Sequence, residues 1–297
     1  MKLVVFDDYR IGVLDGLSVR DVSAAVPKWE SGDIHAMNRL IAGWDGLRRR
    51  VAEVAASANA VPLGKVRLRP PVPAPTHLLA APSNYRAHSD EMRTGAAGVP
   101  VRQDSSRPRQ TAEELGFFMK AMSSISGPAD PIELPLKVYP DRRFDHEGEI
   151  AFVVGRPARG VSPRDAIDYI FGYTIMIDAT MRASKEKSEE RVQRKSFASF
   201  SPMGPCLTTA DEMGPWQNIG VKLFLNGEQR QHAQATDMIV DIPNLLSRAS
   251  QVMPLLPGDV YTTGSPAGVS PIAVGDTVEV EAERIGKMTL SVVERGW

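Results

Sequence analysis

The stretch FDHEGEIAFVV, residues 144–154, is the sharpest local feature of the sequence. Residues two apart in a β-strand lie on the same face, so Glu147 and Glu149 point the same way. The opposite face is expected to be buried and consists of Ile150, Phe152 and Val154. Adjacent carboxylates repel each other unless a cation lies between them, and hard divalent cations such as Mg²⁺ prefer oxygen ligands. The pattern therefore indicates either a cation site or a solvated strand end.

A third carboxylate follows another apolar strand. The stretch GYTIMID, residues 172–178, delivers Asp178 at its carboxyl end. An acid in that position is either a helix cap or a metal ligand. Spacing alone leaves open whether Asp178 meets Glu147 and Glu149.

Around these two stretches the sequence predicts a domain dominated by strands. Strands are expected at residues 78–81, 150–154, 173–177, 221–225, 259–263, 277–281 and 288–293, with a hairpin turn at residues 226–227. Ser162 begins a predicted helix that ends at Gly172, and a short helix begins near Pro243. The polar, glycine-rich segment between Arg86 and Glu114 predicts a long structureless lid or mobile loop.

The first 72 residues predict a small α+β domain, and residues 73–297 form the second domain. Strands are expected at residues 3–6 and 11–14, with a hairpin turn at residues 15–16. Asp33 is expected to cap a single helix whose apolar residues recur at helical spacing as far as Val54. Five prolines between Pro62 and Pro75 indicate an extended linker, which places the domain boundary near residue 72.

The charges and the single cysteine bound the class of protein. The 297 residues include 35 Lys and Arg and 36 Asp and Glu, a formal net charge of −1. This balance lacks the basic footprint of nucleic-acid-binding proteins and offers no attraction to an anionic membrane. No stretch reaches the ~20 apolar residues that cross a bilayer, and we expect no signal peptide, because the apolar run at residues 3–6 is too short. Cys206 is the single cysteine and cannot form an intrachain disulfide. Together with the balanced charge, this leads us to expect a cytoplasmic protein without nucleic-acid or membrane partners.

Seven blocks of the chain, in order, resemble the fumarylacetoacetate hydrolase family over residues 76–293. They are SNYRAHSDE at 83–91, FMKAMSS with GP at 118–128, DHEGE at 145–149, GYT through Asp178 to Arg182, KSF with PMGP at 195–205, NGE at 226–228, and LPGD with GSPAGV at 256–269. Fumarylpyruvate hydrolases, acylpyruvases and 2-hydroxyhepta-2,4-diene-1,7-dioate isomerases are the most similar members. The resemblance implies a mainly β (α+β) fold, a mixed β-sandwich roll that follows the small N-terminal α+β domain.

The resemblance also implies a metal centre and a catalytic dyad. Glu147, Glu149 and Asp178 would bind one divalent cation, Mg²⁺ in the first place, with Mn²⁺ or Ca²⁺ as alternatives. His88 and Glu91 would act as a base and the group that orients it, and helical spacing puts both on one face. Without the resemblance, His88 would be interpreted as a surface histidine. Catalytic Lys195 matches a lysine that the family keeps near the bound substrate.

Five residues are implied to contact the substrate. Arg182 matches a substrate-binding arginine, and Tyr85 lies in the first matching block. The glycine-rich turn that contains Gly264 and Ser265 lets backbone N–H groups approach a ligand, although a simple strand connection is the alternative. Ser265 replaces the common threonine and keeps its hydroxyl. Lys185 stands where the family has glutamine, which favours a more anionic substrate.

Two other residues near these motifs are interpreted as structural. His146 stands where the family usually has an aromatic residue, and strand alternation directs it away from Glu147 and Glu149. Lys120 matches an inward lysine of the family, but a surface amine on a strand is the preferred interpretation.

The function implied is hydrolysis of a carbon–carbon bond in a ketonic substance. The substrate would be a small oxo acid, an acylpyruvate or other β-diketo acid such as fumarylpyruvate, from the breakdown of aromatic compounds. An isomerase, tautomerase or decarboxylase on the same scaffold is the alternative, and a non-catalytic ligand-binding protein is a second one. The resemblance further implies a homodimer.

Overall fold

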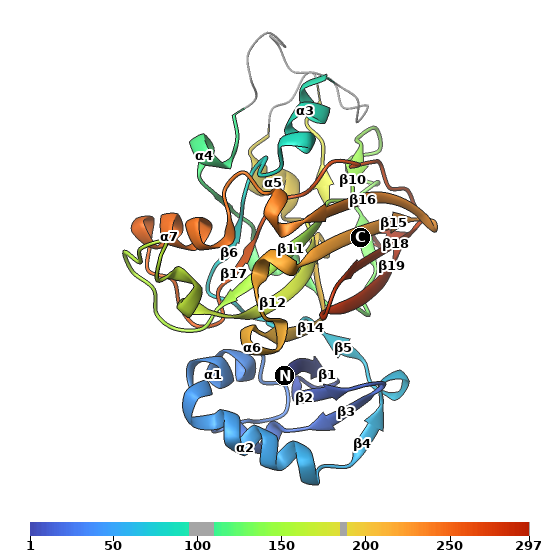
Figure 1. The fold of residues 1–297 in the computed structure, drawn as a ribbon. Helices are drawn as coiled ribbons and strands as arrows, with labels where there is room; N and C mark the ends of the chain where they lie inside the picture. The colour runs from blue at the N-terminus through green and yellow to red at the C-terminus, as the bar shows by residue number, and fades with distance from the viewer. Residues whose placement is uncertain (95–109, 185–188, 297) are drawn as a thin grey trace.

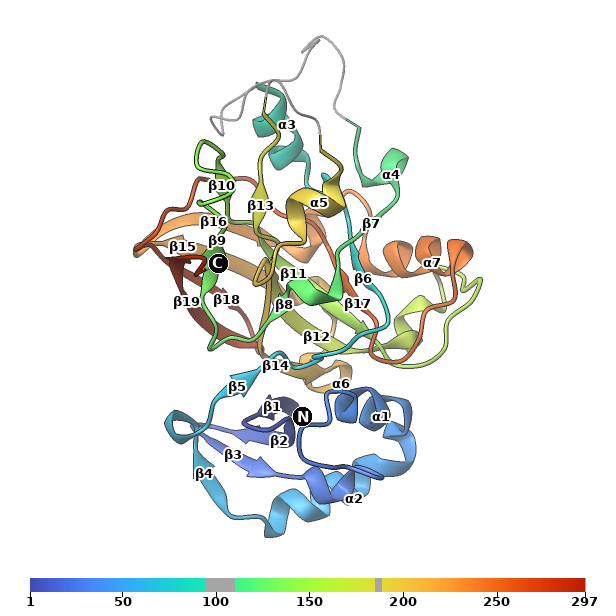
Figure 2. The same ribbon diagram turned by 180° about the vertical axis from the view of Figure 1, so that it is seen from behind.

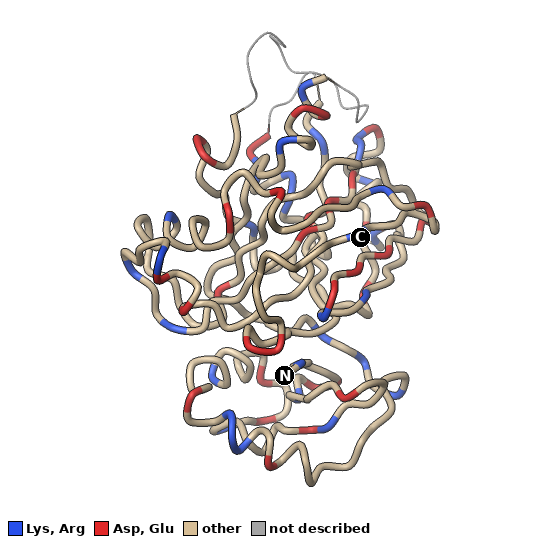
Figure 3. Tube along the Cα trace, viewed as in Figure 1, with Lys and Arg blue, Asp and Glu red and all other residues tan. Residues whose placement is uncertain are grey.

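A small lobe and a larger part make up the molecule (Figures 1 and 2). The computed structural model describes residues 1–94, 110–184 and 189–296. The N-terminal lobe, residues 1–69, is the blue part of Figure 1. Acidic and basic residues are interspersed along the trace of both parts (Figure 3).

The N-terminal lobe pairs a sheet with two helices. Its elements are β1 (Lys2–Phe6), β2 (Arg10–Asp15), β3 (Ser18–Asp21), α1 (Ala36–Ala42), α2 (Trp44–Ser57), β4 (Ala60–Pro62) and β5 (Leu68–Arg69). The hairpin expected at residues 15–16 joins β2 to β3. The single helix expected after Asp33 is wrong, because the chain forms two helices separated by Gly43. Asp33 lies before the first of them, where its carboxylate accepts the backbone N–H of His35 and pairs with Arg39.

One sheet continues from this lobe into the larger part. Strand β1 pairs with β14 (Ser201–Thr209), with Leu3 opposite Leu207. The segment expected to be a linker contributes β5, which pairs with β1. The two parts share backbone hydrogen bonds and an apolar core. The domain boundary near residue 72 stays a prediction.

Two sheets pack against each other in the larger part. The extended sheet continues through β12 (Ile170–Ile177), β11 (Gly148–Val154), β17 (Val260–Thr262), β6 (Leu78–Ala80) and β7 (Phe118–Met119). The second sheet has the order β16 (Glu228–Gln234), β15 (Gly220–Leu225), β18 (Thr277–Ala282), β19 (Gly286–Glu294) and β9 (Ile132–Leu134). Ile150 and Phe152 belong to one buried cluster with Leu223 and Val280, so side chains of both sheets form the core between them. The predicted mainly β, sandwich-like fold is confirmed.

Strand β11 is buried on both faces, whereas only its even-numbered face was expected to be. Ala151 and Val153 share the face of the two glutamates and are inaccessible to solvent. They belong to the apolar cluster that contains Leu3 and Val5 of the N-terminal lobe. The lobe therefore covers the carboxylate face of β11 beyond the point where the glutamates end.

The helix expected between Ser162 and Gly172 is reduced to a single 3₁₀ turn, Ala166–Tyr169. Gly172 ends no helix but lies inside β12. A Cβ atom there would come within 2.3 Å of the carbonyl oxygen of Thr208 on the neighbouring β14. The glycine is needed for close approach of two strands. The helix expected near Pro243 is α7 (Ile242–Val252), capped by the side chain of Asp241.

The segment between Arg86 and Glu114 contains two helices, so it is not structureless where it is described. Helix α3 spans Arg86–Thr94 and buries His88, Ser89 and Met92 on one face. Helix α4 (Ala112–Leu115) begins with a capping box between Thr111 and Glu114. Residues 95–109, the rest of the expected lid, lie outside the described residues.

Candidate active site and metal centre

Three carboxylates meet at the end of the β11–β12 pair. In this antiparallel pair Gly148 lies opposite Ile177, so the residues that flank them, Glu147 and Asp178, are also neighbours. The backbone N–H of Asp178 donates to the carbonyl of Glu147 at 2.8 Å. One oxygen from each of Glu147, Glu149 and Asp178 lies within 4.8 Å of the others, and all three residues are buried. Strand register thus brings together the carboxylates that spacing alone could not join.

Two buried lysines hold this acidic triad. Lys195, at the end of α5 (Arg191–Lys195), donates to Glu147 Oε2 at 2.7 Å, to Asp178 Oδ2 at 2.5 Å and to Thr180 Oγ1 at 2.7 Å. Lys120 donates to the other oxygen of Asp178 at 2.6 Å and to the carbonyl of Phe200 at 2.7 Å. The interpretation of Lys120 as a surface amine is therefore wrong, and its match to an inward lysine was the correct signal.

The charges of the triad are unevenly balanced. Burial opposes ionisation of Glu147, yet Lys195 and Arg182 hold its pKa well below the usual value. Burial also disfavours charge on Lys195, but Asp178 and Glu147 raise its pKa. For Glu149, burial and the negative charges of Asp178 and Glu147 raise the pKa well above its ordinary value. The side chains thus leave Glu149 without a full counter-charge.

Glu149 has no ion pair among the described residues, and this fits a divalent cation. Glu149 accepts hydrogen bonds from the hydroxyl of Thr262 and, at 2.9 Å, from the backbone N–H of Gly264. Neither donor carries a charge. Three converging carboxylate oxygens are a donor set that Mg²⁺, Mn²⁺ and Ca²⁺ accept, so the residues present fit the implied cation.

Arg182 pairs with two carboxylates, and its contact with a substrate stays a prediction. Its Nε donates to Asp145 Oδ2 at 2.5 Å, and its terminal nitrogen donates to Glu147 Oε1 at 2.6 Å. Arg143 donates to the second oxygen of Asp145 at 2.6 Å. Sequence reasoning missed Asp145, although strand alternation places it on the face of Glu147 and could have revealed it.

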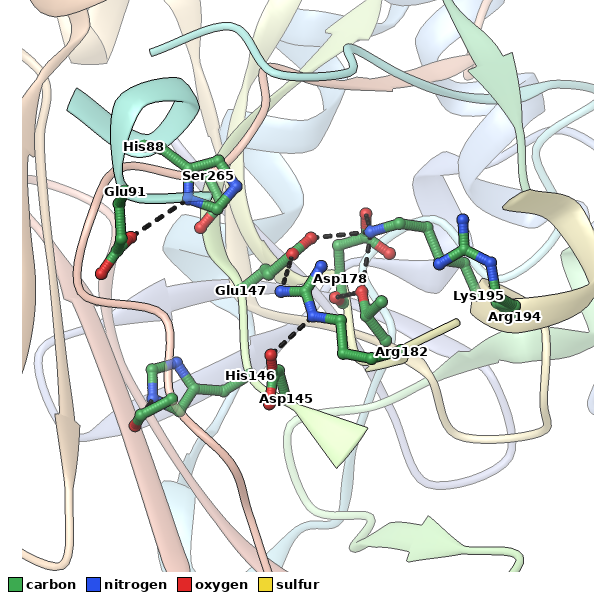
Figure 4. Close-up of polar contacts among 12 residues, drawn as sticks. His88, Glu91, Asp145, His146, Glu147, Asp178, Arg182, Arg194, Lys195 and Ser265 are labelled. Atoms are coloured by element: carbon green, nitrogen blue, oxygen red, sulfur yellow. Dashed lines mark hydrogen bonds and ion pairs between the residues drawn. The ribbon is translucent and has the colours of Figure 1, made fainter. Parts of the chain in front are cut away.

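His88 and Glu91 form the expected pair on one face of α3. The Nδ1 of His88 lies 3.4 Å from Glu91 Oε2, and the imidazole is almost fully buried. The Glu91 carboxylate also accepts the backbone N–H of Gly268 at 3.1 Å. Burial opposes the charge of Glu91, but the hydrogen bonds from His88 and Gly268 lower its pKa overall. Figure 4 shows this pair at one side of the acidic cluster and Lys195 at the other.

The glycine-rich turn lies between the triad and the dyad. Gly264 and Gly268 have positive φ angles of 92° and 97°. A Cβ atom on Gly268 would come within 1.8 Å of the carbonyl oxygen of Arg230. The backbone N–H groups of both glycines are engaged by carboxylates, which makes this turn more than a strand connection. Ser265, between them, is buried and accepts a hydrogen bond from Gln231.

The remaining predicted residues differ in where they lie. Tyr85 is buried at the start of α3, and burial raises the pKa of its phenol. Lys185 lies outside the described residues. His146 contacts Gln231 and Ser270 and makes no hydrogen bond to the triad among the described residues, in keeping with its structural interpretation.

No helix among the described residues is long and apolar enough to span a membrane.

Comparison with known proteins identifies relatives over the full length. The chain is 37% identical over 295 residues to maleylpyruvate hydrolase of Aquipseudomonas alcaligenes, covering 98% of this chain and 99% of the relative. A solved maleylpyruvate hydrolase from Sphingobium sp. SYK-6, in complex with manganese(II) and pyruvate, superposes with a TM-score of 0.82 at 34% identity and 99% coverage of both chains. A solved 2-hydroxyhepta-2,4-diene-1,7-dioate isomerase from Mycobacterium marinum superposes with a TM-score of 0.72 at 28% identity and full coverage of both chains. Residues 78–293 match the family described as fumarylacetoacetate (FAA) hydrolase, C-terminal. The chain therefore belongs to the fumarylacetoacetate hydrolase family.

Proposed function

We propose that this enzyme hydrolyses the bond between the acyl carbonyl carbon and the methylene carbon of an acylpyruvate, with maleylpyruvate as the first candidate substrate. The observation that carries the proposal is the buried triad of Glu147, Glu149 and Asp178, with Lys195 on two of its members. Full-length similarity to two maleylpyruvate hydrolases supports hydrolysis over the alternatives. An isomerase remains the second candidate, because an isomerase of the same fold is also a structural neighbour.

The triad would hold one divalent cation. A cation there would supply the positive charge that binds the oxygens of a 2-oxo acid and stabilises the enolate charge that develops as the bond breaks. Mg²⁺ is our proposal for the native ion. Mn²⁺ is the competing candidate, since it is the ion in the solved relative that also holds pyruvate.

His88 is the proposed general base. Its Nδ1 faces Glu91, which leaves Nε2 to take a proton from water. The hydroxide adds to the distal carbonyl carbon, and the bond to the central methylene carbon breaks. The electron pair of that bond passes to the pyruvate portion as its enolate, which takes up a proton to give pyruvate, while the acyl portion leaves as a carboxylate. Lys195, kept charged by its acidic neighbours, lies where negative charge develops.

The local charge favours a substrate with two carboxylates. Asp145 and the triad face Lys120, Arg182, Lys195 and, at the edge, Arg143. These charges balance before a divalent cation binds, so the loaded site would be positive.

A further cation lies one helical turn from Lys195. The guanidinium of Arg191 is 5.8 Å from the centroid of the Phe118 ring, and the Lys195 ammonium is 5.5 Å from the same centroid. Within residues 1–94, 110–184 and 189–296, the Arg191 guanidinium has no hydrogen bond or ion pair. We propose that Arg191 binds the distal carboxylate of the substrate.

The expected homodimer and cytoplasmic location stay predictions. Light scattering coupled to size-exclusion chromatography tests the first, and subcellular fractionation tests the second.

An assay of purified protein on a substrate panel tests the proposed function. The panel contains maleylpyruvate, fumarylpyruvate, acetylpyruvate and oxaloacetate, each with added Mg²⁺, with Mn²⁺ or with EDTA. We expect loss of the ultraviolet absorbance of the diketo acid, stoichiometric release of pyruvate and the matching carboxylate, and no turnover in EDTA. Isomerised substrate without pyruvate release would favour the isomerase, and carbon dioxide release from oxaloacetate alone would favour a decarboxylase.

A further inference from the structure

Gln231 is a fully buried amide that joins the metal-binding strand to the glycine-rich turn. It lies on β16, in the second sheet, and is 1% exposed. Its Oε1 accepts the backbone N–H of Gly148 at 2.9 Å and lies 3.2 Å from His146 Nδ1. Its Nε2 donates to Ser265 Oγ at 2.7 Å and to the carbonyl of Pro266 at 2.8 Å. All of its hydrogen-bonding capacity is directed at the two segments that carry the site.

Two backbone partners fix the orientation of this amide. The N–H of Gly148 can only donate, so the oxygen of Gln231 must face it. The carbonyl of Pro266 can only accept, so the nitrogen must face that side. It follows that His146 carries its hydrogen on Nδ1 and that its Nε2 accepts the hydroxyl of Ser270, 2.8 Å away.

The orientation of the Gln231 amide also determines the direction of its hydrogen bond with Ser265. Its Oγ accepts one N–H of Gln231, so the serine hydroxyl keeps its own proton for another acceptor. Among the described residues the acceptor within reach is the carbonyl of Pro266 at 3.4 Å, which already receives Gln231 at 2.8 Å. A bond of 3.4 Å between two oxygens is long for a hydroxyl donor. The proton of Ser265 is therefore available to a ligand.

Ser265 lies in the turn that contacts both the acidic triad and the dyad. The preceding residue, Gly264, donates its backbone N–H to Glu149. Three residues further on, Gly268 donates its backbone N–H to Glu91 of the dyad. Gln231 and His146 hold this turn at Ser265, Pro266 and Ser270, and both side chains are buried behind it.

We propose that Gln231 is a positioning residue that fixes the hydroxyl of Ser265 as a hydrogen-bond donor to the substrate oxygen on which negative charge develops. The inference rests on the proposed function, because it requires a substrate that gains negative charge in the reaction. Gln231 does not touch the substrate itself. It acts through the direction of one proton and the position of one turn.

A double-mutant cycle tests this assignment, with kcat and KM measured for maleylpyruvate hydrolysis. Gln231→Met keeps the size of the side chain and removes its polar contacts. We expect it to lower kcat at least tenfold when Ser265 is present and less than twofold in the Ser265→Ala background, because Gln231 acts through that hydroxyl. An equal loss of kcat in both backgrounds would overturn the assignment.

Controls separate this outcome from loss of the fold or of the reaction. Gln229→Met alters an exposed residue of the same strand and should keep the wild-type rate. Should Gln231→Met fail to fold, Gln231→Glu takes its place in the cycle, since it keeps an oxygen toward Gly148 and loses the N–H donor to Ser265. Mn²⁺ binding should be unchanged in the folded variants. If wild type and Gln229→Met release no pyruvate, the proposed function fails; if they do release it and the cycle is additive, only the role of Gln231 fails.

Discussion

His88 and Glu91 illustrate how a residue's chemistry depends on its neighbours. They are three residues apart on α3 and share a face. The backbone N–H of Gly268 donates to the Glu91 carboxylate, and that carboxylate contacts the imidazole of His88. In the sequence alone, the same histidine is indistinguishable from a surface residue. Contact with Glu91 sets its orientation, and the imidazole is almost fully buried.

Replacing His88 by Ala should separate hydrolysis from metal binding. The imidazole is not part of the acidic triad, so the cation should bind as in the wild type. Loss of a general base lowers kcat by about 10²- to 10⁴-fold. Steady-state kinetics and Mn²⁺ titration of the same preparation measure both. His232→Ala, an exposed histidine on β16, is the matched control and should be fully active; an unchanged rate in His88→Ala would remove the dyad from the mechanism.

Arg191 should determine preference for a distal carboxylate. In Arg191→Leu we expect KM for maleylpyruvate to rise about tenfold or more, because one charge-assisted hydrogen bond is lost. KM for acetylpyruvate, which has no distal carboxylate, should change less than twofold. Equal effects on both substrates would contradict the assignment. Arg159→Leu, an exposed arginine in the loop after β11, is the control and should leave both constants unchanged.

At the residue scale, the sequence predicted some of the residues that meet at the site but not others. Strand alternation predicts Glu147 and Glu149 on one face; in the structure Glu149 lies in β11 and Glu147 directly precedes it. Asp178 could not be added by spacing, because its position depends on the register between β11 and β12. Lys120 was misjudged because an amine on a short strand is usually exposed, whereas here its charge is matched by Asp178.

An ion pair connects two short polar segments beside the site. Glu189, just before α5, accepts two hydrogen bonds from Arg142, at 2.7 and 3.1 Å. Arg142 also donates to the carbonyl of Arg182 at 2.6 Å. The hydrogen bonds from Arg142 lower the pKa of Glu189 to about 2, and both side chains are largely buried. One arginine thus links the strand end at Arg182 to the start of the helix that carries Lys195.

This pair predicts a pH-dependent contribution to stability. The pKa of Glu189 is lower in the folded protein than in the unfolded chain, so its contribution is complete above about pH 4.5 and is lost as the pH falls toward 2. Glu189→Gln should lower the free energy of unfolding by ~1 kcal/mol at neutral pH. Thermal melts of both proteins across pH 2.5–7 measure the difference, which should shrink on acidification. A difference that is constant or grows would contradict the assignment.

At the element scale, strands were predicted better than helices. Apolar runs bounded by turns located β11, β12, β15 and β18, since buried strands leave a continuous signal in the sequence. The predicted bounds of two helices were wrong, in each case at a glycine. Gly43 separates two helices that share one apolar period, and Gly172 permits close approach of β12 to β14 instead of ending a helix. Both outcomes depend on neighbours distant in the sequence.

The candidate metal centre is a property of the whole molecule. Its carboxylates come from the ends of β11 and β12, its lysines from α5 and the residue after β7, and its serine turn from the segment after β17. The N-terminal lobe, which has no predicted chemistry, covers the apolar continuation of the carboxylate face. Similarity to the family predicted this assembly, because a family pattern carries long-range information that composition and period do not.

Calorimetric titration of the metal-free enzyme with Mn²⁺, comparing wild type with Asp178→Ala, tests the central claim most directly. Asp178 supplies one of three converging oxygens and pairs with two lysines, so its loss removes a ligand and leaves the buried Lys120 without a carboxylate partner among the described residues, while Lys195 keeps Glu147. We expect one Mn²⁺ per wild-type chain, and no measurable binding and no turnover in the variant, with the fold verified by circular dichroism. Wild-type stoichiometry and affinity in folded Asp178→Ala, or near-native activity of that variant in metal-free buffer, would contradict the account.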